Sequence, residues 1–395
     1  MPSASVATSA SASASASASS TPTSSPSVEP SLDPSPTAAA GGSFEVAWEE
    51  VPGFEHPGRS DEGGEGGVAV HGISLIEGRW FATGSAGRDA AIWTSSDGTA
   101  WTRATIATIR AADEAMRAEG VVVIGDVLVA VGSWGAVPSD QFAWVTWRST
   151  DSGSSWEEDR NSALPFGLRA ITAGGPGAVG VVWTYAGTLP FDSVIVTTDD
   201  GVEWSEHRPS SMRVAEVKAV AAFGDRLVAV GRQLDEGTPA AWISDDDGAT
   251  WGMVLLASAT EDGMGVASDL VVSDTEIVAV GESGAAASPI PVAWRSTDGE
   301  TWTVAPMGEA GSAIGVTAVD RGFVAVGGAT SNEPAPPMVW TSPDASSWTE
   351  TSPPTETSLW IEAVAGSVGE VNAGALCADD PCATTLWHGV ITEPD

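Results

Sequence analysis

Apolar residues recur along this chain in short runs that are separated by clusters of Gly, Asp, Ser and Thr. The run at residues 240–251, AAWISDDDGATW, contains the basic unit: an apolar strand, a tight acidic turn and a second short strand, with one Trp on each side of the turn. Short apolar runs bounded by turn residues predict β-strands joined by hairpins. The longest segment with amphipathic helical spacing covers only residues 109–119. We therefore expect an all-β protein.

Five more segments repeat this unit, at residues 92–101, 147–156, 196–204, 294–302 and 340–348. The carboxylates that define the six units are Asp97, Asp151, Asp199, Asp246, Asp298 and Asp344. Successive carboxylates are 46 to 54 residues apart. This period exceeds that of helical-pair repeats and is typical of β-propeller blades.

The composition of each acidic turn indicates a structural role. A Ser or Thr precedes the Asp by two positions, and a Gly follows in five of the six units, with Ala345 as the exception. The Asp can accept N–H bonds from its own turn, and the Gly can adopt a positive φ. The closing Trp is expected to pack back over the hairpin, where burial of its ring contributes at most about 4–6 kcal/mol.

Between the acidic turns the sequence predicts a cycle of four strands. Seven segments fit an inner strand, seven fit a second strand that often reads V-A-V-G, and seven fit a third, but only six fourth strands follow in sequence. Residues 44–51, FEVAWEEV, resemble a fourth strand, with Trp48 in the position of the closing Trp. The prediction is a seven-bladed β-propeller of four-stranded antiparallel blades, closed by this N-terminal strand. A six-bladed ring is the alternative.

The units that begin at Ser149, Thr197 and Ser244 have the pattern S/T-x-D-x-G-x-x-W, and the other three are one residue shorter. In this pattern the chain resembles the Asp-box (BNR repeat) β-propellers, which include sialidases, related secreted glycosidases and non-catalytic propellers similar to photosystem II assembly factors. The resemblance covers about residues 44–395 and implies a WD40/YVTN/BNR-like fold. It also implies that the Asp-box hairpins lie on the face away from the ligand site.

The net charge of −37, from 16 basic and 53 acidic residues, narrows the range of partners. Nucleic acids and anionic membranes require basic surfaces, so neither is expected as a partner. An acidic surface for solubility or salt adaptation is the leading interpretation, with divalent cations or a cationic partner as alternatives. The run Asp245-Asp246-Asp247 could contribute to a calcium site, but Asp246 is already assigned to its turn and calcium needs more oxygen ligands. We therefore expect no metal site and no cofactor.

Residues 1–42 are rich in Ser, Ala, Thr and Pro and predict a disordered stalk, followed by a single propeller domain at residues 43–395. The two cysteines, Cys377 and Cys382, have the spacing of a local disulfide in an oxidising compartment. No apolar run of about 18 residues is present, so no transmembrane segment is expected. The first residues lack the basic and apolar segments of an export signal. We nevertheless expect an extracellular or envelope location, with an export signal, such as a lipoprotein signal, missing from the given sequence.

Trp134, Trp183 and Tyr185 fall in the predicted connections between second and third strands, at the face opposite the Asp-box turns. These aromatic side chains could form a platform for a sugar or an apolar side chain, or they could pack the loops onto the ring. The sialidase reaction needs a Tyr nucleophile with a Glu partner, three Arg and an acidic Asp, and Tyr185 is the single Tyr of the chain. Few Arg are available, and Arg148 and Arg295 lie within the Asp-box hairpins. No catalytic residue is therefore assigned.

Because the repeats are clear and the catalytic patterns are missing, we expect a monomeric, secreted or envelope-tethered propeller that binds a protein or glycan partner without catalysis. The partner is expected on the face opposite the Asp-box turns. A glycoside hydrolase of the sialidase-like type is one alternative, and it is the class expected if the protein is an enzyme. An assembly factor or scaffold for a membrane complex is the other.

Overall fold

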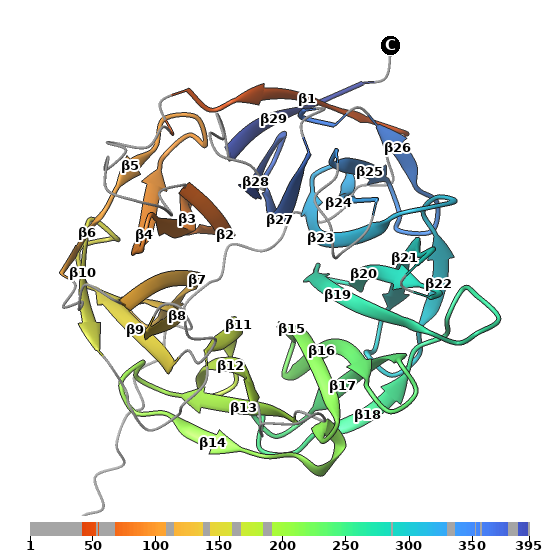
Figure 1. The fold of residues 1–395 in the computed structure, drawn as a ribbon, viewed down its shortest axis with the longest axis horizontal. Helices are drawn as coiled ribbons and strands as arrows, with labels where there is room; N and C mark the ends of the chain where they lie inside the picture. Colours follow the sequence, from red (N-terminus) through yellow and green to blue (C-terminus); the bar gives the residue numbers. More distant parts are fainter. Residues whose placement is uncertain are drawn as a thin grey trace, which may run out of the picture.

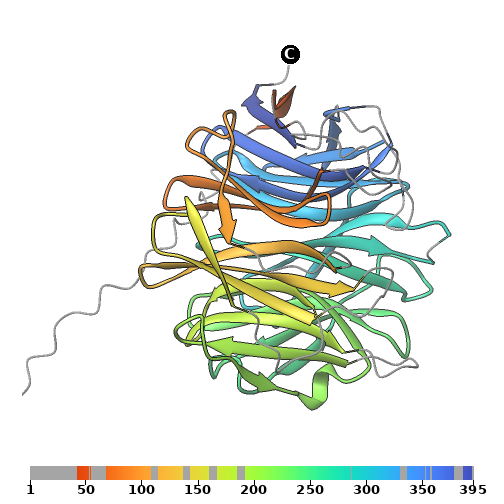
Figure 2. The same cartoon turned by 60° about the vertical axis from the view of Figure 1, so that its left-hand side comes forward.

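The computed structural model describes residues 42–52, 54, 68–107, 114–136, 143–159, 167–184, 192–285, 287–329, 336–351, 353–355, 358–377 and 386–393. These residues form seven β-sheets arranged around one axis, and the only helical element among them is the 3-10 turn η1 (Ser210–Met212) (Figure 1). A view from the side shows the sheets as blades of a ring (Figure 2). The predicted all-β, seven-bladed β-propeller is confirmed, and the six-bladed alternative is excluded. Almost all of the predicted stalk, residues 1–41, lies outside the described residues.

We number the blades 1 to 7 by their innermost strands. The innermost strands are β2 (Val68–Ile76), β7 (Glu114–Ile124), β11 (Leu168–Gly174), β15 (Ala215–Phe223), β19 (Gly265–Val272), β23 (Ser312–Val319) and β27 (Leu359–Gly366). The second strands are β3 (Arg79–Ala86), β8 (Val127–Ala136), β12 (Gly177–Thr184), β16 (Arg226–Gln233), β20 (Ile277–Ser283), β24 (Gly322–Gly328) and β28 (Glu370–Cys377). From Glu114 onward, the segment with helical spacing at residues 109–119 is therefore strand.

The third strands are β4 (Asp89–Ser95), β9 (Ala143–Ser149), β13 (Asp192–Thr198), β17 (Thr238–Ser244), β21 (Ile290–Ser296), β25 (Met338–Ser342) and β29 (Leu386–Thr392). The outer strands are β5 (Thr102–Arg103), β10 (Ser155–Asp159), β14 (Ser205–His207), β18 (Gly252–Leu255), β22 (Thr303–Pro306), β26 (Thr349–Thr351) and β1 (Glu45–Glu50). Blade 2 has a fifth strand, β6 (Thr105–Ala107), which pairs in parallel with β10.

The ring closes through the N-terminal strand, as predicted. β1 pairs antiparallel with β29, so the first and last strands of the chain share blade 7. Phe44 and Val46 are buried against residues of blades 6 and 7, and the Phe44 carbonyl accepts a 3.0 Å bond from the Thr341 hydroxyl of blade 6. Trp48 lies opposite Gly389, in the outer strand where a closing Trp was predicted. This closure pairs strands that would otherwise be open edges.

The hydrophobic core is divided among the seams between blades. Seven apolar clusters are present, and each combines residues of two neighbouring blades. The third strands contribute the largest members, the almost fully buried side chains of Trp147, Trp242, Trp294, Trp340 and Trp387. Since both faces of each sheet are covered by neighbouring blades, the strands are apolar on both faces, which explains their nearly continuous Val and Ala runs.

Every innermost strand has a β-bulge at the same place, opposite the segment of the second strand that reads V-A-V-G in blades 2, 4, 5 and 6 and F-A-T-G in blade 1. The recurring glycine has a specific cause. A Cβ added at Gly84, Gly132 or Gly231 would lie within about 2.0 Å of a backbone carbonyl oxygen of the innermost strand, and Gly281 and Gly327 have the same contact. A side chain is therefore excluded because the two backbones touch there. Val182 and Ala375 occupy this register position in blades 3 and 7.

The acidic turns are held by hydrogen bonds to their carboxylates. Asp97 Oδ1 accepts the N–H groups of Thr99 and Ala100 at 2.9 Å, and Asp151 accepts both the N–H and the hydroxyl of Ser155. Asp246, Asp298 and Asp344 make bonds of the same kind to the N–H groups that follow them. The closing Trp donates its indole N–H to the turn carbonyl in five units, those of Trp101, Trp156, Trp251, Trp302 and Trp348.

The position predicted in the third unit is one residue too early. Asp200, not Asp199, accepts the N–H groups of the turn, and Thr198, not Thr197, supplies the hydroxyl that bonds to it. β13 continues to Thr198, and the Thr197 hydroxyl contacts His207 instead. Two adjacent aspartates allowed either alignment. This unit therefore belongs to the short type, so four turns are short and two, those of Asp151 and Asp246, contain an extra residue.

The extra residue of the long turns is Ser152 or Asp247, and each has a positive φ, of 57° and 56°. The glycine that follows also has a positive φ, at Gly153 and Gly248. In the short turns only the position directly after the Asp is left-handed, and Ala345 adopts it with a φ of 58°. The exceptional alanine therefore takes the glycine conformation, at the steric cost that a Cβ carries there.

We expect deletion of residues 43–51 from the full chain to lower Tm by about 10 °C or more. Removing buried aromatic and aliphatic side chains such as Phe44 and Val46 costs several kcal/mol, about 3–5 kcal/mol for a Phe alone. It also leaves β29 as an unpaired edge. Differential scanning calorimetry of the deletion variant beside the full chain measures the loss. An unchanged Tm would contradict the closure of the ring by β1.

We expect the acidic turns to stabilise the protein in a pH-dependent way. N–H bonds from Ala100 and Thr99 lower the pKa of Asp97 to about 2, and the Ser155 hydroxyl and N–H lower the pKa of Asp151 to about 2. Both values lie below 3.8, so the stabilisation is complete above about pH 4 and is lost as pH falls towards 2. Asp97→Asn and Asp151→Asn should therefore lower Tm at pH 7 and lower it much less near pH 2.

The matched control is Asp199→Asn, because the third turn uses Asp200. Its Tm should equal that of the parent protein at every pH, whereas Asp200→Asn should behave like the two variants above. A larger loss of Tm for Asp199→Asn than for Asp200→Asn would show that Asp199, as predicted from the sequence, is the carboxylate that holds this turn.

Candidate functional site

The seven bulges place one side chain per blade at the same height around the ring axis. The bulged residues are His71, Glu119, Arg169, Lys218, Ser268, Ile314 and Glu362. The residue before each bulge is buried, whereas six bulged residues are partly exposed and Arg169 is fully exposed, because the bulge turns the side chain out of the seam. We call this set the bulge ring.

The bulge ring lies towards the end of the propeller that is opposite the acidic turns. Each bulge comes at or before the middle of its innermost strand, near the connection that arrives from the previous blade. The acidic turns follow the third strands, which run parallel to the innermost strands and end at the other side of the ring. The bulge ring is therefore on the side where the sequence predicts the ligand.

Two cations of neighbouring blades meet at one indole in this ring. Arg169 of β11 lies with its Cζ 4.8 Å from the ring centroid of Trp183, and Lys218 of β15 has its Nζ 5.0 Å from the same centroid. The Trp183 indole N–H donates a 2.6 Å bond to the Val217 carbonyl of the next blade, which fixes the ring across the seam. Lys218 is the single lysine of the chain. Such contacts are favourable because the aromatic face is electronegative.

Glu216 connects this pair to a third cation. Its carboxylate, 6 % exposed, lies 2.8 Å from Lys218 Nζ and 2.7 Å from Arg232 Nε. Burial raises the pKa of Glu216, but the charges and hydrogen bonds of Lys218 and Arg232 outweigh it, and the net shift is downward. Together these four side chains carry three positive charges and one negative charge, in a protein of net charge −37.

The opposite side of the bulge ring is acidic and contains a histidine. His71 Nδ1 lies 2.6 Å from Glu362 Oε2, which joins blades 1 and 7, and Glu119 of blade 2 lies 2.5 Å from Arg117 Nε. Burial lowers the pKa of His71. The hydrogen bond to Glu362 and the negative charges of Glu119 and Glu362 raise the pKa by more than burial lowers it, so the net shift is upward. The two sides together give the bulge ring a cationic half and a His-carboxylate half.

Asp269 follows the bulged Ser268 in blade 5. Its Oδ2 accepts a 2.9 Å bond from the Val316 N–H of blade 6. Burial raises the pKa of Asp269 to about 6, although the N–H bonds from Val316 and Leu270 act in the opposite direction. This carboxyl joins two innermost strands, and we assign it a structural role.

The structure does not bring Trp134 and Trp183 together. Trp134 packs against the apolar cluster between blades 1 and 2, whereas Trp183 packs in the seam between blades 3 and 4, and the seam between blades 2 and 3 separates them. Tyr185 lies outside the described residues, as do Cys382 and the side chain of Cys377. A shared platform of Trp134 and Trp183 therefore has no support, and of the two only Trp183 contacts members of the bulge ring, Arg169 and Lys218.

Sequence reasoning missed the other members of the bulge ring, although one signal was available. The recurring glycine of the second strand pairs with the residue before the bulge, and the unpaired residue is the next one along the innermost strand. Ionisable residues occupy that position in several blades, as at His71, Glu119 and Lys218. They would have been candidates if the bulge had been recognised.

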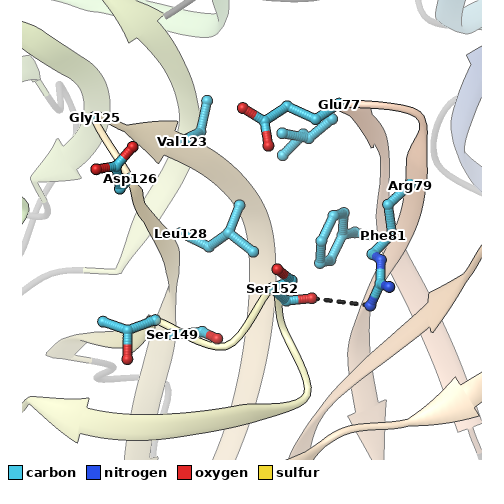
Figure 3. A pocket seen from close by; sticks show the side chains of 11 residues that line it. Glu77, Arg79, Phe81, Val123, Gly125, Asp126, Leu128, Ser149 and Ser152 are labelled. Carbon is cyan, nitrogen blue, oxygen red and sulfur yellow. Dashed lines mark hydrogen bonds between the residues drawn. The ribbon is translucent and has the colours of Figure 1, made fainter.

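On the acidic-turn side, a pocket of about 350 Å³ lies between blades 1 and 2 (Figure 3). Phe81, Val123 and Leu128 line its apolar side, and Arg79 donates a 3.0 Å bond to the Ser152 carbonyl at its edge. In blade 4, Arg226 makes the equivalent 2.7 Å bond to the Asp298 carbonyl of blade 5. Because this contact recurs at another seam, we interpret the pocket as part of blade packing.

Within the described ranges, no group of three or more His, Cys, Asp or Glu side chains is arranged to hold a metal ion. Asp246 accepts bonds from both the N–H and the hydroxyl of Thr250, so its two oxygens are used within the turn. No helix formed by the described residues has the length and apolar character needed to cross a membrane.

Comparisons with known proteins support the fold. No protein-family model matches the chain, and a search of curated proteins found no match. A protein of unknown function from Dyadobacter fermentans is 15 % identical, with 72 % of this chain and 99 % of that one covered at a TM-score of 0.50.

Two further solved structures are each 9 % identical to this chain. The match to the endosialidase of phage phi92 covers 89 % of this chain and 70 % of the endosialidase chain, with a TM-score of 0.53. The match to the polysaccharide lyase Uly1 covers 92 % of this chain and 100 % of the lyase chain, with a TM-score of 0.51. At these identities the likeness shows a shared fold, and two of these neighbours act on glycans according to their names.

We expect the pKa of His71 to lie above 6.5 and to fall in Glu362→Gln, because this substitution removes one charge and the 2.6 Å bond. A histidine whose pKa is higher in the folded than in the unfolded state stabilises the protein fully at pH values below its unfolded-state pKa. This stabilisation is lost as the pH rises through its folded-state pKa. NMR titration of the His71 ring protons measures the shift, with Glu206→Gln on outer strand β14 as control. An unchanged His71 titration in Glu362→Gln would contradict this pairing.

Proposed function

We propose that this protein binds a carboxylate-bearing glycan at the cationic half of the bulge ring without turning it over. The observation that carries the proposal is the convergence of Arg169 and Lys218 on the indole of Trp183. The two glycan-active neighbours of the same fold add support at the level of the architecture.

The geometry suits recognition of a carboxylate beside a sugar ring. Arg169 is exposed, so its guanidinium can form paired bonds to a carboxylate, while Trp183 holds its position from below. Glu216 and Arg232 fix Lys218, which lowers the entropic cost of ordering this side chain on binding. The acidic surface elsewhere repels an anionic ligand at a distance, so binding should depend on the short-range pairs and on salt that screens the repulsion.

A glycoside hydrolase remains the second candidate because one observation favours it. His71 and Glu362 form a close pair with Glu119 nearby, and such a group can transfer protons. We prefer binding without catalysis because both carboxylates already have partners, Glu362 with His71 and Glu119 with Arg117. In this proposal the His71–Glu362 pair joins blades 1 and 7.

We further propose that the acidic turns are Asp-box hairpins and that the protein acts outside the cytoplasm. The hydrogen bonds from the turn N–H groups to Asp97, Asp151 and Asp246 support the first point, together with the indole bonds to the turn carbonyls. The spacing of Cys377 and Cys382 supports the second. No cofactor is part of the proposal.

The test uses polygalacturonate as a carboxylated probe and dextran as a neutral one, at about 0.15 M salt. The full chain should bind the first probe more tightly in isothermal titration calorimetry. Arg169→Ala and Lys218→Ala should each weaken binding by about tenfold to a hundredfold, because each removes a charged hydrogen bond. Arg208→Ala is the matched control, since Arg208 pairs with Glu206 at the outer edge of the same blade as Arg169.

Equal binding of both probes, or equal loss in the Arg208→Ala control, would contradict the site. Release of reducing ends or unsaturated products by the full chain would contradict binding without turnover. If Glu362→Gln then abolished that release, the hydrolase alternative would replace the proposal.

A further inference from the structure

The fourth strand of blade 4 differs from the fourth strands of the other six blades. β18 has the sequence GMVL, without a charge or a proline. The other six contain Arg103, Glu157, Glu206, Pro306, Glu350 or Glu49 within their bounds. Charged residues and proline protect exposed sheet edges from pairing with another chain. β18 lacks this protection, as does the short fifth strand β6 (TIA) at the edge of blade 2, and β18 lies at the rim of the ring (Figure 1).

The backbone register leaves the polar groups of two β18 residues directed outward. The Leu256 N–H donates to the Pro239 carbonyl, which makes Leu255 and Ala240 a pair without mutual hydrogen bonds. Because such pairs alternate along an antiparallel ladder, the N–H and C=O groups of Met253 and Leu255 face away from β17. At the start of the strand the Ser211 hydroxyl already bonds to the Trp251 carbonyl, which marks one end of the open edge.

The same two residues expose their side chains. Met253 is 42 % and Leu255 is 53 % exposed, and they are two of the five large hydrophobic side chains that are exposed in the described part of the chain. Being two positions apart, they lie on one face of the strand. An open backbone edge and exposed apolar side chains therefore coincide at β18.

The end of this edge is acidic. A pocket of about 580 Å³ is lined by Met253, Val254, Asp245, Asp246 and Glu300. Arg226 lies 2.7 Å from Asp245 and 3.0 Å from Glu300, so one cation pairs with two of the three carboxylates that line the pocket. The pocket keeps a net negative charge, which complements a basic group.

Blade 2 shows that a blade of this ring accepts a fifth strand. β6 adds in parallel to β10 through three residue pairs, with Thr105 opposite Ser155. The open edge of β18 has a similar length. A short extended segment is therefore sufficient to extend a blade.

We propose that β18 is a docking edge for an extended segment of a partner protein, which adds as a fifth strand to blade 4 and places basic residues at the end near Asp245 and Glu300. Backbone hydrogen bonds to Met253 and Leu255 supply the pairing, and their side chains contact alternate apolar side chains of the segment. A second copy of this chain is a poorer occupant, because two such edges would bring two acidic ends and two chains of charge −37 together.

The test variant is Leu255→Pro in the full chain. A proline there removes an outward N–H and leaves the bonds to β17, and blade 5 already carries a proline, Pro306, at the same register position. The Tm should therefore stay at the parent value. The probes are fluorescein-labelled ten-residue peptides of alternating Val and Thr, with two Lys at either the N- or the C-terminal end, and matched peptides with Glu in place of Lys.

In fluorescence anisotropy, one of the Lys peptides should bind the full chain at least about tenfold more tightly than its Glu counterpart, and Leu255→Pro should weaken it by about tenfold or more. The control Glu350→Ala, on the outer strand of blade 6, should bind like the parent. Hydrogen exchange should show new protection of the Met253 and Leu255 amides. Arg169→Ala should leave peptide binding unchanged, which separates this site from the glycan site.

Equal binding by Leu255→Pro and the parent would overturn the proposal, as would equal binding of the Lys and Glu peptides or no binding of any peptide. A concentration-dependent dimer in analytical ultracentrifugation that Leu255→Pro abolishes would assign the edge to a second copy instead.

Discussion

The contact between two backbones at the glycine of V-A-V-G determines the inner geometry of this propeller. In five blades a carbonyl of the innermost strand lies where a Cβ would otherwise be, as at Gly84 and Gly231. The bulge that accompanies this contact turns one side chain per blade out of the packed seam. The bulge ring is thus a consequence of blade packing, and any chemistry at this end of the propeller depends on which residues occupy the seven bulged positions.

The repeat explains why the fold was predictable and why the site was not. An acidic turn and a closing Trp are local features, so their recurrence was sufficient to predict the blades. The additional fourth strand around Trp48 was sufficient to predict that the N-terminal strand closes the ring. The adjacent Asp199 and Asp200 show the limit of local patterns, since only the end of β13 at Thr198 decides between them. Trp134 and Trp183 show another limit: they occupy similar places in neighbouring repeats, but the side on which each ring packs depends on strand register.

Because the protein is strongly acidic, the positions of its few basic side chains indicate their roles. Arg79 and Arg226 hold turn carbonyls of the next blade, and Arg321 pairs with Glu393 across another seam. These arginines fasten neighbouring blades to each other. Arg169 and Lys218 instead lie at the bulge ring over an aromatic face, where packing does not require a charge. In a protein that repels anions, this is the position at which positive charge has the clearest ligand-binding use.

Both proposed sites involve blade 4, yet the geometry favours independent binding. Lys218 lies on the innermost strand and Met253 on the outermost one, with β16 and β17 between them. The innermost strand is fixed by the Gly231 contact and by the Trp183 bond to the Val217 carbonyl, both of which leave little room for displacement. A strand added at β18 would extend the sheet without moving β15. Since two strands, β16 and β17, separate the two edges, their binding free energies should add.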